Sequence, residues 1–174
     1  MDNQEFNFDY IQICLDQYRK EFVEYLKTLM QKKNSKGYNR VASGNLLASL
    51  KTRMENDSNF ARYIIYLVHL PYLKYLEDGT RPHYPPFNPI LKWVREKGIP
   101  TKEKTGNRNL PTEKGMAYLV QRKIGREGTE GIPMVKQTQD FLNPLFEQKL
   151  SEAFEQDIYE FSRDPMMVIS LHFR

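Results

Sequence analysis

The chain has 174 residues, of which 40% are hydrophobic and 28% are charged, so it can bury one core and does not have the composition of a disordered protein. Its 26 Lys and Arg residues against 22 Asp and Glu residues give a net charge of +4, far below the basic excess of a dedicated nucleic-acid-binding protein. The chain opens with acidic residues, and no window approaches about 18 consecutive apolar residues, so neither secretion nor a membrane span is expected.

The first predicted element is a long amphipathic helix over about residues 9–30. Apolar residues recur there every three or four positions, with charged residues between them. Asp9 is the expected N-cap, because a short carboxylate side chain can accept the free backbone N–H groups of the first turn. Cys14, the single cysteine, lies in the apolar stripe and cannot form an internal disulfide, so we expect a buried thiol in a protein of reducing, cytosolic origin.

A β-hairpin is predicted after this helix. Ser43 and Asn45 are expected to cap a short helical turn, and the residues that follow alternate between apolar and polar over 50–55, as in a half-buried strand. The turn-forming residues 56–59 separate this segment from residues 60–69, which are rich in Tyr, Ile and Val. Two strands joined by a short turn form a hairpin.

The second half of the chain is predicted to be mainly helical. Apolar periodicity, capping residues, Pro and Gly first predict a short helix over 72–77 and an extended Pro-rich loop over 81–86. A helix from Asn88 as N-cap to Gly98 and an exposed mobile loop over 99–109 are expected next. The chain should then form a helix from Thr112 as N-cap to Gly125, a long helix over 141–161 and a strand over 166–173.

Together these elements predict a single α+β domain over residues 1–174. A small antiparallel sheet, made of the hairpin and the C-terminal strand, is expected to pack against the long N- and C-terminal helices. The polar stretch over about residues 99–139 is expected to be an exposed insert in this domain.

Charge is segregated along the chain. Residues 92–127 hold ten basic and four acidic residues, for a net charge of +6, whereas residues 140–164 hold two basic and seven acidic residues, for a net charge of −5. Such blocks are commonly solvated faces, and they also suit contacts in which one subunit attracts the next.

The segment 70–86, LPYLKYLEDGTRPHYPP, is the most distinctive part of the sequence. Tyr72, Tyr75 and Leu76 are three and four positions apart, so they share one face of a short helix, and this face can simply close the end of the core. Gly79 permits a sharp reversal, and Glu77 could accept backbone N–H bonds that lock the turn.

At these residues the sequence resembles the tail-completion or neck proteins of long-tailed bacteriophages, whose members carry a Tyr-x-x-Tyr-[Val/Leu]-Glu-x-Gly-Thr core. Three further elements agree in order with that resemblance: Ser43-Gly44-Asn45-Leu46 with Ser49, then Arg81-Pro82-His83 with Pro85 and Pro86 before Trp93-Val94, and finally Gly131, Pro133, Phe141, Leu142 and Pro144. The match covers about residues 43–158. The insert over 99–139 and the strand over 166–173 depart from the family pattern.

The resemblance implies a non-enzymatic virion protein that is made in the bacterial host cytoplasm and forms or joins a ring in the head-to-tail connector. Six or twelve copies, contact with the portal and with other neck or tail proteins, weak non-specific contact with passing DNA, and no cofactor are expected. The interface or motif residues are then Ser43, Gly44, Asn45, Leu46, Tyr72, Tyr75, Glu77, Gly79, Thr80, Arg81, Pro82, His83, Pro85 and Pro86. Within this set, residues 72–80 are expected to hold the fold and residues 81–86 to touch a neighbour.

Two other classes of protein remain open at this point. Basic residues near Tyr38 and around Trp93 and Tyr118 would suit a small nucleic-acid-binding protein, such as a host-encoded adaptor. A nuclease or toxin-like enzyme would need a convergent catalytic set, and the sequence has no Gly-rich phosphate loop, nucleophile elbow or paired-carboxylate spacing. The three histidines lack metal-ligand spacing, so no metal site is expected.

Overall fold

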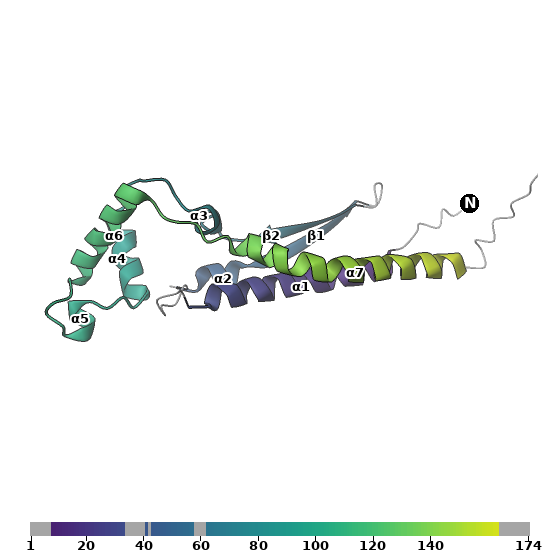
Figure 1. Cartoon of the computed structure of the whole chain (residues 1–174), viewed down its shortest axis with the longest axis horizontal. Helices are drawn as coiled ribbons and strands as arrows, with labels where there is room; N and C mark the ends of the chain where they lie inside the picture. The colour runs from purple at the N-terminus through teal and green to yellow at the C-terminus, as the bar shows by residue number, and fades with distance from the viewer. Residues whose placement is uncertain (1–7, 34–40, 42, 58–61, 164–174) are drawn as a thin grey trace, which may run out of the picture.

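The computed structural model describes residues 8–33, 41, 43–57 and 62–163. Figure 1 shows the long first and last helices lying side by side, a β-hairpin along them, and the helices of residues 87–127 grouped at one end of the molecule. The elements in chain order are α1 (Asp9–Gln31), α2 (Asn45–Ser49), β1 (Lys51–Asp57), β2 (Arg62–Val68), α3 (Leu73–Asp78), α4 (Phe87–Glu96), α5 (Lys102–Thr105), α6 (Glu113–Glu127) and α7 (Met134–Arg163).

The molecule has two parts, a body and an arm. The body consists of α1, α2, β1, β2, α3 and α7, and the arm consists of α4, α5 and α6. The predicted α+β class, with a small antiparallel sheet packed on long N- and C-terminal helices, is confirmed. The strand predicted over 166–173 lies outside the described residues.

The body is built on the antiparallel pair α1 and α7. Tyr18 of α1 meets Phe146 of α7 edge-on at a ring distance of 5.0 Å, and Tyr25 stacks on Phe141 at 4.5 Å. The apolar stripe predicted for the first helix is the side that faces α7 and the short elements, and the buried cluster is formed by Cys14, Phe22, Leu26, Met30, Leu46, Leu50, Leu73, Met134, Leu142 and Phe146.

The N-terminus of α1 is capped by a residue from the other end of the chain. Asp157 of α7 is only 3% exposed, and its two carboxylate oxygens accept hydrogen bonds from the backbone N–H groups of Tyr10 at 2.9 Å and Ile11 at 3.0 Å. Asp9, the expected N-cap, is instead the first residue of the helix, and the N-cap position is taken by Phe8. The N-cap prediction was therefore wrong, because Asp157 supplies the acceptor from a distant helix.

The predicted hairpin is present, with an antiparallel register that pairs Lys51 with Val68 and Met54 with Ile65. One face packs on the helices: the Thr52 hydroxyl donates to the Arg19 carbonyl of α1 at 3.3 Å, and Leu67 packs against the buried cluster. The alternation read from the sequence therefore separates a helix-facing side from an exposed side.

The arm has a small core of its own. Val94 of α4 and Ala117 of α6 are fully buried, and the Arg95 guanidinium of α4 lies 2.7 Å from the Glu113 carboxylate of α6. The Thr112 hydroxyl accepts from the Gly115 N–H at 3.0 Å, so the N-cap predicted for α6 is confirmed.

Three other local predictions differ from the structure. Helix α2 follows Gly44 in a left-handed conformation, with no side-chain cap from Ser43 or Asn45. Helix α4 follows Pro86, so Asn88 lies inside it and is not its N-cap. The exposed loop predicted over 99–109 contains the short helix α5, and Thr101, which directly precedes that helix, is fully buried.

The segment 99–139 runs through both parts of the molecule. It includes α5 and α6 in the arm and the first turns of α7 in the body, where Met134 and Thr138 are buried. The final helix thus begins at Met134, well before the predicted start at residue 141, and continues through Pro144.

Candidate functional site

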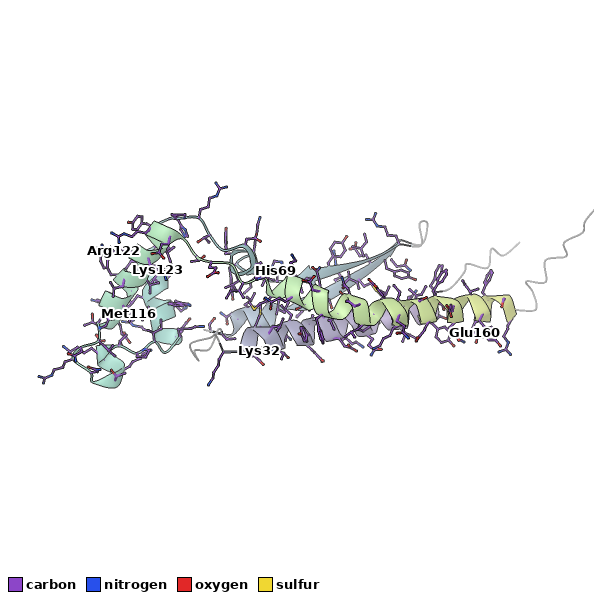
Figure 2. All side chains as sticks on the ribbon, in the orientation of Figure 1. Lys32, His69, Met116, Arg122, Lys123 and Glu160 are labelled. Atoms are coloured by element: carbon purple, nitrogen blue, oxygen red, sulfur yellow. The ribbon has the colours of Figure 1, made fainter. Side chains whose placement is uncertain are left out.

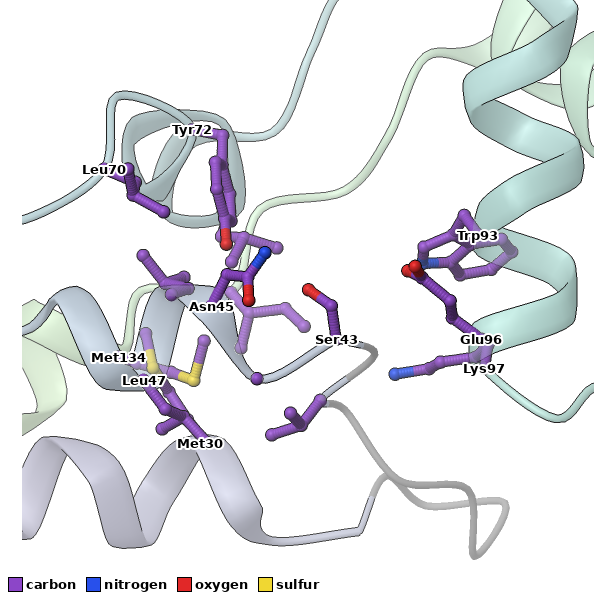
Figure 3. A pocket seen from close by; sticks show the side chains of 15 residues that line it. Met30, Ser43, Asn45, Leu47, Leu70, Tyr72, Trp93, Glu96, Lys97 and Met134 are labelled. Atoms are coloured by element: carbon purple, nitrogen blue, oxygen red, sulfur yellow. The ribbon is translucent and has the colours of Figure 1, made fainter.

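A cleft of about 540 Å³ lies where the arm meets the body. Figure 3 shows its two walls: Trp93 and Glu96 of α4 with Lys97 directly after that helix on one side, and side chains from α1, α2, α7 and the segment before α3 on the other. The lining residues are Met30, Val41, Ser43, Gly44, Asn45, Leu46, Leu47, Leu70, Tyr72, Leu76, Trp93, Glu96, Lys97, Ile132 and Met134.

The polar groups of the cleft lie among mostly apolar side chains. Tyr72 is 40% exposed, and burial of its ring raises the pKa of the phenol, while a hydrogen bond from the Leu46 backbone acts in the opposite direction. Burial also lowers the pKa of Lys97, since it disfavours the charged ammonium. An apolar cleft with a few polar groups at its walls is suited to binding a side chain or a short segment of another molecule.

The first anchor of this region is Glu77 of α3. Its Oε1 accepts a hydrogen bond of 2.9 Å from the backbone N–H of Val135 in the first turn of α7. The Leu76 carbonyl also accepts from the Ile132 N–H at 2.7 Å. The motif glutamate thus stabilises the start of the longest helix, where a negative charge is favoured by the helix dipole.

The second anchor is a pair of backbone segments that join the body to the arm. These two linkers, residues 79–86 leaving the body and 128–133 returning to it, meet at Thr80 and Thr129, whose backbone groups exchange hydrogen bonds of 2.9 and 3.0 Å. The two threonine hydroxyls also lie 2.9 Å apart. The two linkers that carry the arm are therefore joined to each other by a short antiparallel bridge.

Glycine is required where the linkers pass each other. Gly79 has φ +73, and a Cβ there would lie 2.2 Å from the Thr129 carbonyl oxygen. Gly128 has φ +74, and a Cβ there would lie 2.0 Å from the Thr80 carbonyl oxygen. Both positions need a left-handed backbone and leave no space for a side chain.

The Pro-rich segment 81–86 lies on the arm side of this bridge. Its backbone is held to α6, because the His83 N–H donates to the Ile124 carbonyl at 3.3 Å and the Gln121 side chain donates to the Pro85 carbonyl at 2.7 Å. Most of its side chains are exposed, including those of Arg81, Pro82, His83 and Pro86. The segment therefore has a fixed backbone and an exposed surface.

The structure divides the candidate residues into three groups. Ser43, Gly44, Asn45, Leu46 and Tyr72 meet in the cleft. Glu77, Gly79 and Thr80 lie at the anchors, and residues 81–86 follow along the linker. Tyr75 is not a cleft residue: it is 61% exposed on α3.

Several residues of this region were not proposed as site residues. Lys97, Glu96 and Met30 line the cleft, and Thr129 completes the bridge between the linkers. Glu96 and Lys97 follow Trp93 by three and four positions, so they lie on the same side of the helix as the tryptophan. This spacing would have identified both residues if Trp93 had been chosen as a site residue. No sequence signal pointed to Thr129.

Among the described residues, no group of His, Cys, Asp and Glu side chains is placed to bind a metal ion. In the same part of the chain, no helix is both long and apolar enough to cross a membrane. Comparison of the chain with family models, with curated proteins and with solved structures gave no match.

We expect replacement of Glu77 by Ala to lower the free energy of unfolding by about 1–2 kcal/mol, because the Val135 N–H loses a charged acceptor at the start of α7. Urea denaturation of the purified protein measures this change. Glu130, exposed in the neighbouring linker, is the matched control, and its replacement by Ala should change stability by less than about 0.5 kcal/mol. Equal effects of the two substitutions would contradict the capping role of Glu77.

Proposed function

We propose that this protein is a non-enzymatic structural subunit of the head-to-tail connector of a tailed bacteriophage. It forms or joins a ring that links the portal to the tail and lets DNA pass. In this proposal the chain is made in the bacterial host cytoplasm and ends in the virion neck.

The observation that carries the proposal is the meeting of separate sequence elements at one place. The elements that resemble those of the phage proteins are far apart in the chain, yet residues 43–46, Tyr72, Trp93 and the segment at Ile132 and Met134 line one cleft. Residues 77–80 anchor the two linkers beside it. A shared site gives a physical reason for these elements to occur together.

The shape and charge of the molecule support a role in assembly. The arm carries most of the basic block and lies at one end of an elongated molecule, whereas the acidic block is on α7, whose C-terminal end is at the other (Figure 1). Two different surfaces of opposite charge favour a contact that repeats from one subunit to the next, and such contacts close into rings when the rotation between subunits allows it.

The second candidate function is sequence-independent contact with nucleic acid. It is favoured by the exposed basic residues of α6, among them Arg122 and Lys123, which Figure 2 places at the arm end of the molecule. A connector ring around passing DNA needs only weak contacts of this kind. The two functions are therefore compatible in one protein.

Electron microscopy of purified phage particles tests the proposal. We expect the chain to be present in the particles as a ring of six or twelve copies on the head-to-tail axis, and to bind purified portal rings. Particles that lack the chain, together with a chain that stays monomeric when mixed with portal, would show the proposal to be wrong.

A further inference from the structure

The outer side of α6 combines positive charge with exposed apolar side chains. Lys114, Tyr118 and Arg122 follow each other at four-residue intervals and therefore lie along one line of the helix surface, with Leu119 beside them. Tyr118 is 57% exposed and Leu119 is 50% exposed. We call these four residues the basic face of α6.

The C-terminal half of α7 has a surface of the opposite charge. Leu150, Phe154 and Ile158 form a row at four-residue intervals and are 38%, 47% and 45% exposed. Glu147 and Glu155 lie on the helix surface next to this row, and both are exposed. We call these five residues the acidic face of α7.

A groove beside the acidic face can accommodate a side chain. It has a volume of about 230 Å³, lies between α7, α1 and the hairpin, and includes Ile65 of β2 together with Glu147 and Leu150. Its lining is mainly apolar, so it suits an aromatic or aliphatic side chain brought by another surface.

The two faces match in charge, in polarity and in spacing. Lys114 and Arg122 are eight residues apart on α6, and Glu147 and Glu155 are eight residues apart on α7, which is about 12 Å along a helix in each case. None of these four residues has an ion-pair partner in the described part of the chain. Two ion pairs can therefore form at once when the helices lie against each other, with apolar side chains between them.

The faces cannot meet within one chain. In Figure 2, Arg122 and Lys123 lie at one end of the molecule and Glu160, near the end of α7, lies at the other. A contact between the two faces therefore requires two copies of the chain. On a second copy, each face meets a surface of opposite charge and matching spacing.

We propose that the basic face of α6 in one copy docks on the acidic face of α7 in the next copy, and that Tyr118 enters the groove beside Leu150. This contact rests on the proposed function, because it is the head-to-tail interface from which a ring would be built. It joins two different surfaces, so every copy keeps one free α6 face and one free α7 face until the ring closes.

Contact of the basic face with DNA alone explains fewer of the exposed surfaces than contact with a second copy does. It would use Lys114 and Arg122, but it would leave the exposed apolar row on α7 and the groove beside it without a role. A second copy covers both faces with one kind of contact.

Charge reversal with compensation is the test. One variant carries Glu147→Lys and Glu155→Lys, and the other carries Lys114→Glu and Arg122→Glu. Each variant has like charges on its two faces, so each alone should lose self-association, with the apparent dissociation constant raised at least about 100-fold in sedimentation at low salt. An equal mixture should assemble again, because each variant then offers the charge that the other lacks.

Circular dichroism of each variant checks that the fold is intact, and the recovery in the mixture excludes loss of folding as the cause. Assembly of both variants as in the unmodified protein would overturn this contact while leaving the proposed function in place. An unmodified protein that stays monomeric, alone and with portal, would overturn both.

A binding experiment with random duplex DNA covers the remaining outcome. If the Lys114→Glu, Arg122→Glu variant loses DNA binding but self-associates normally, the basic face serves nucleic acid and the contact proposed here is wrong. In the expected result, the mixture assembles in the presence and in the absence of DNA.

Discussion

The Gly79→Val variant is expected to lose at least about 4 kcal/mol of unfolding free energy. Gly79 has φ +73, a region that a β-branched residue enters only at high cost. In addition, its Cβ would lie 2.2 Å from the Thr129 oxygen and 2.7 Å from the Gly131 nitrogen, and both contacts are with backbone that has little freedom to move. Urea or thermal denaturation measures the loss.

A control at Gly44 measures the cost of a positive φ at a position with free space. Gly44 has φ +79 and ψ −7, and nothing lies within 4 Å of a Cβ built there. Gly44→Val should therefore lose only about 1–2 kcal/mol. Gly79 has ψ −167, a region that is almost restricted to glycine, so its conformational cost is larger and the clash adds to it. Equal losses for the two variants would mean that neither the backbone conformation of Gly79 nor the close approach of the linkers contributes to stability.

The Asp157→Ala variant is expected to lose about 3 kcal/mol. The substitution removes a buried charged acceptor from two backbone N–H groups at the start of α1, which then have no partner. Asp157→Asn keeps one acceptor oxygen and should lose about half as much, since the amide lacks the charge that favours the helix N-terminus. Denaturation with urea at neutral pH compares the two.

Asp140 is the control for Asp157, because it lies on the same helix and is exposed. Its replacement by Ala should change the unfolding free energy by no more than about 0.5 kcal/mol. Hydrogen exchange adds a local measurement: the first turn of α1 should lose protection in Asp157→Ala and keep it in Asp140→Ala. Unchanged protection in both variants would contradict the cap.

The parts of the fold that sequence predicted well depend on short-range patterns. The first helix follows from apolar residues at helical spacing, and the Thr112 cap of α6 follows from a hydroxyl at the right place. The hairpin follows from an alternating segment and a segment rich in Tyr, Ile and Val, with turn-forming residues between them. Each of these signals lies within the element that it predicts.

The features that sequence missed depend on contacts between distant segments. The cap of α1 comes from Asp157, which is 147 and 146 residues from the two N–H groups it binds, and the cap of α7 comes from Glu77, which is 58 residues from the N–H group it binds. Asp9 at the start of α1 predicts an N-cap from the local sequence alone. That local pattern is the same whether Asp9 or a distant residue caps the helix. Glu77 was expected to accept backbone N–H groups, but its partner could not be named from sequence.

The candidate site was predicted as separate elements and not as a cleft. Residues 43–46 and Tyr72 were chosen for their resemblance to other proteins, and only the packing of α2, α3 and α7 shows that they share a surface. The α4 wall of the cleft depends on how the arm is joined to the body, where the two linkers pair at Thr80 and Thr129. Pairing between two loops has no signature in either segment alone.

The bridge between Thr80 and Thr129 also determines how the arm can change without harm to the rest of the molecule. The chain leaves the body and returns to it at adjacent points, so the entropic cost of closing this loop depends only weakly on the length of the arm. A longer or shorter arm also leaves the packing of α1 on α7 unchanged. The body thus acts as a constant scaffold, and the arm is an attachment whose length and surface can change independently of it.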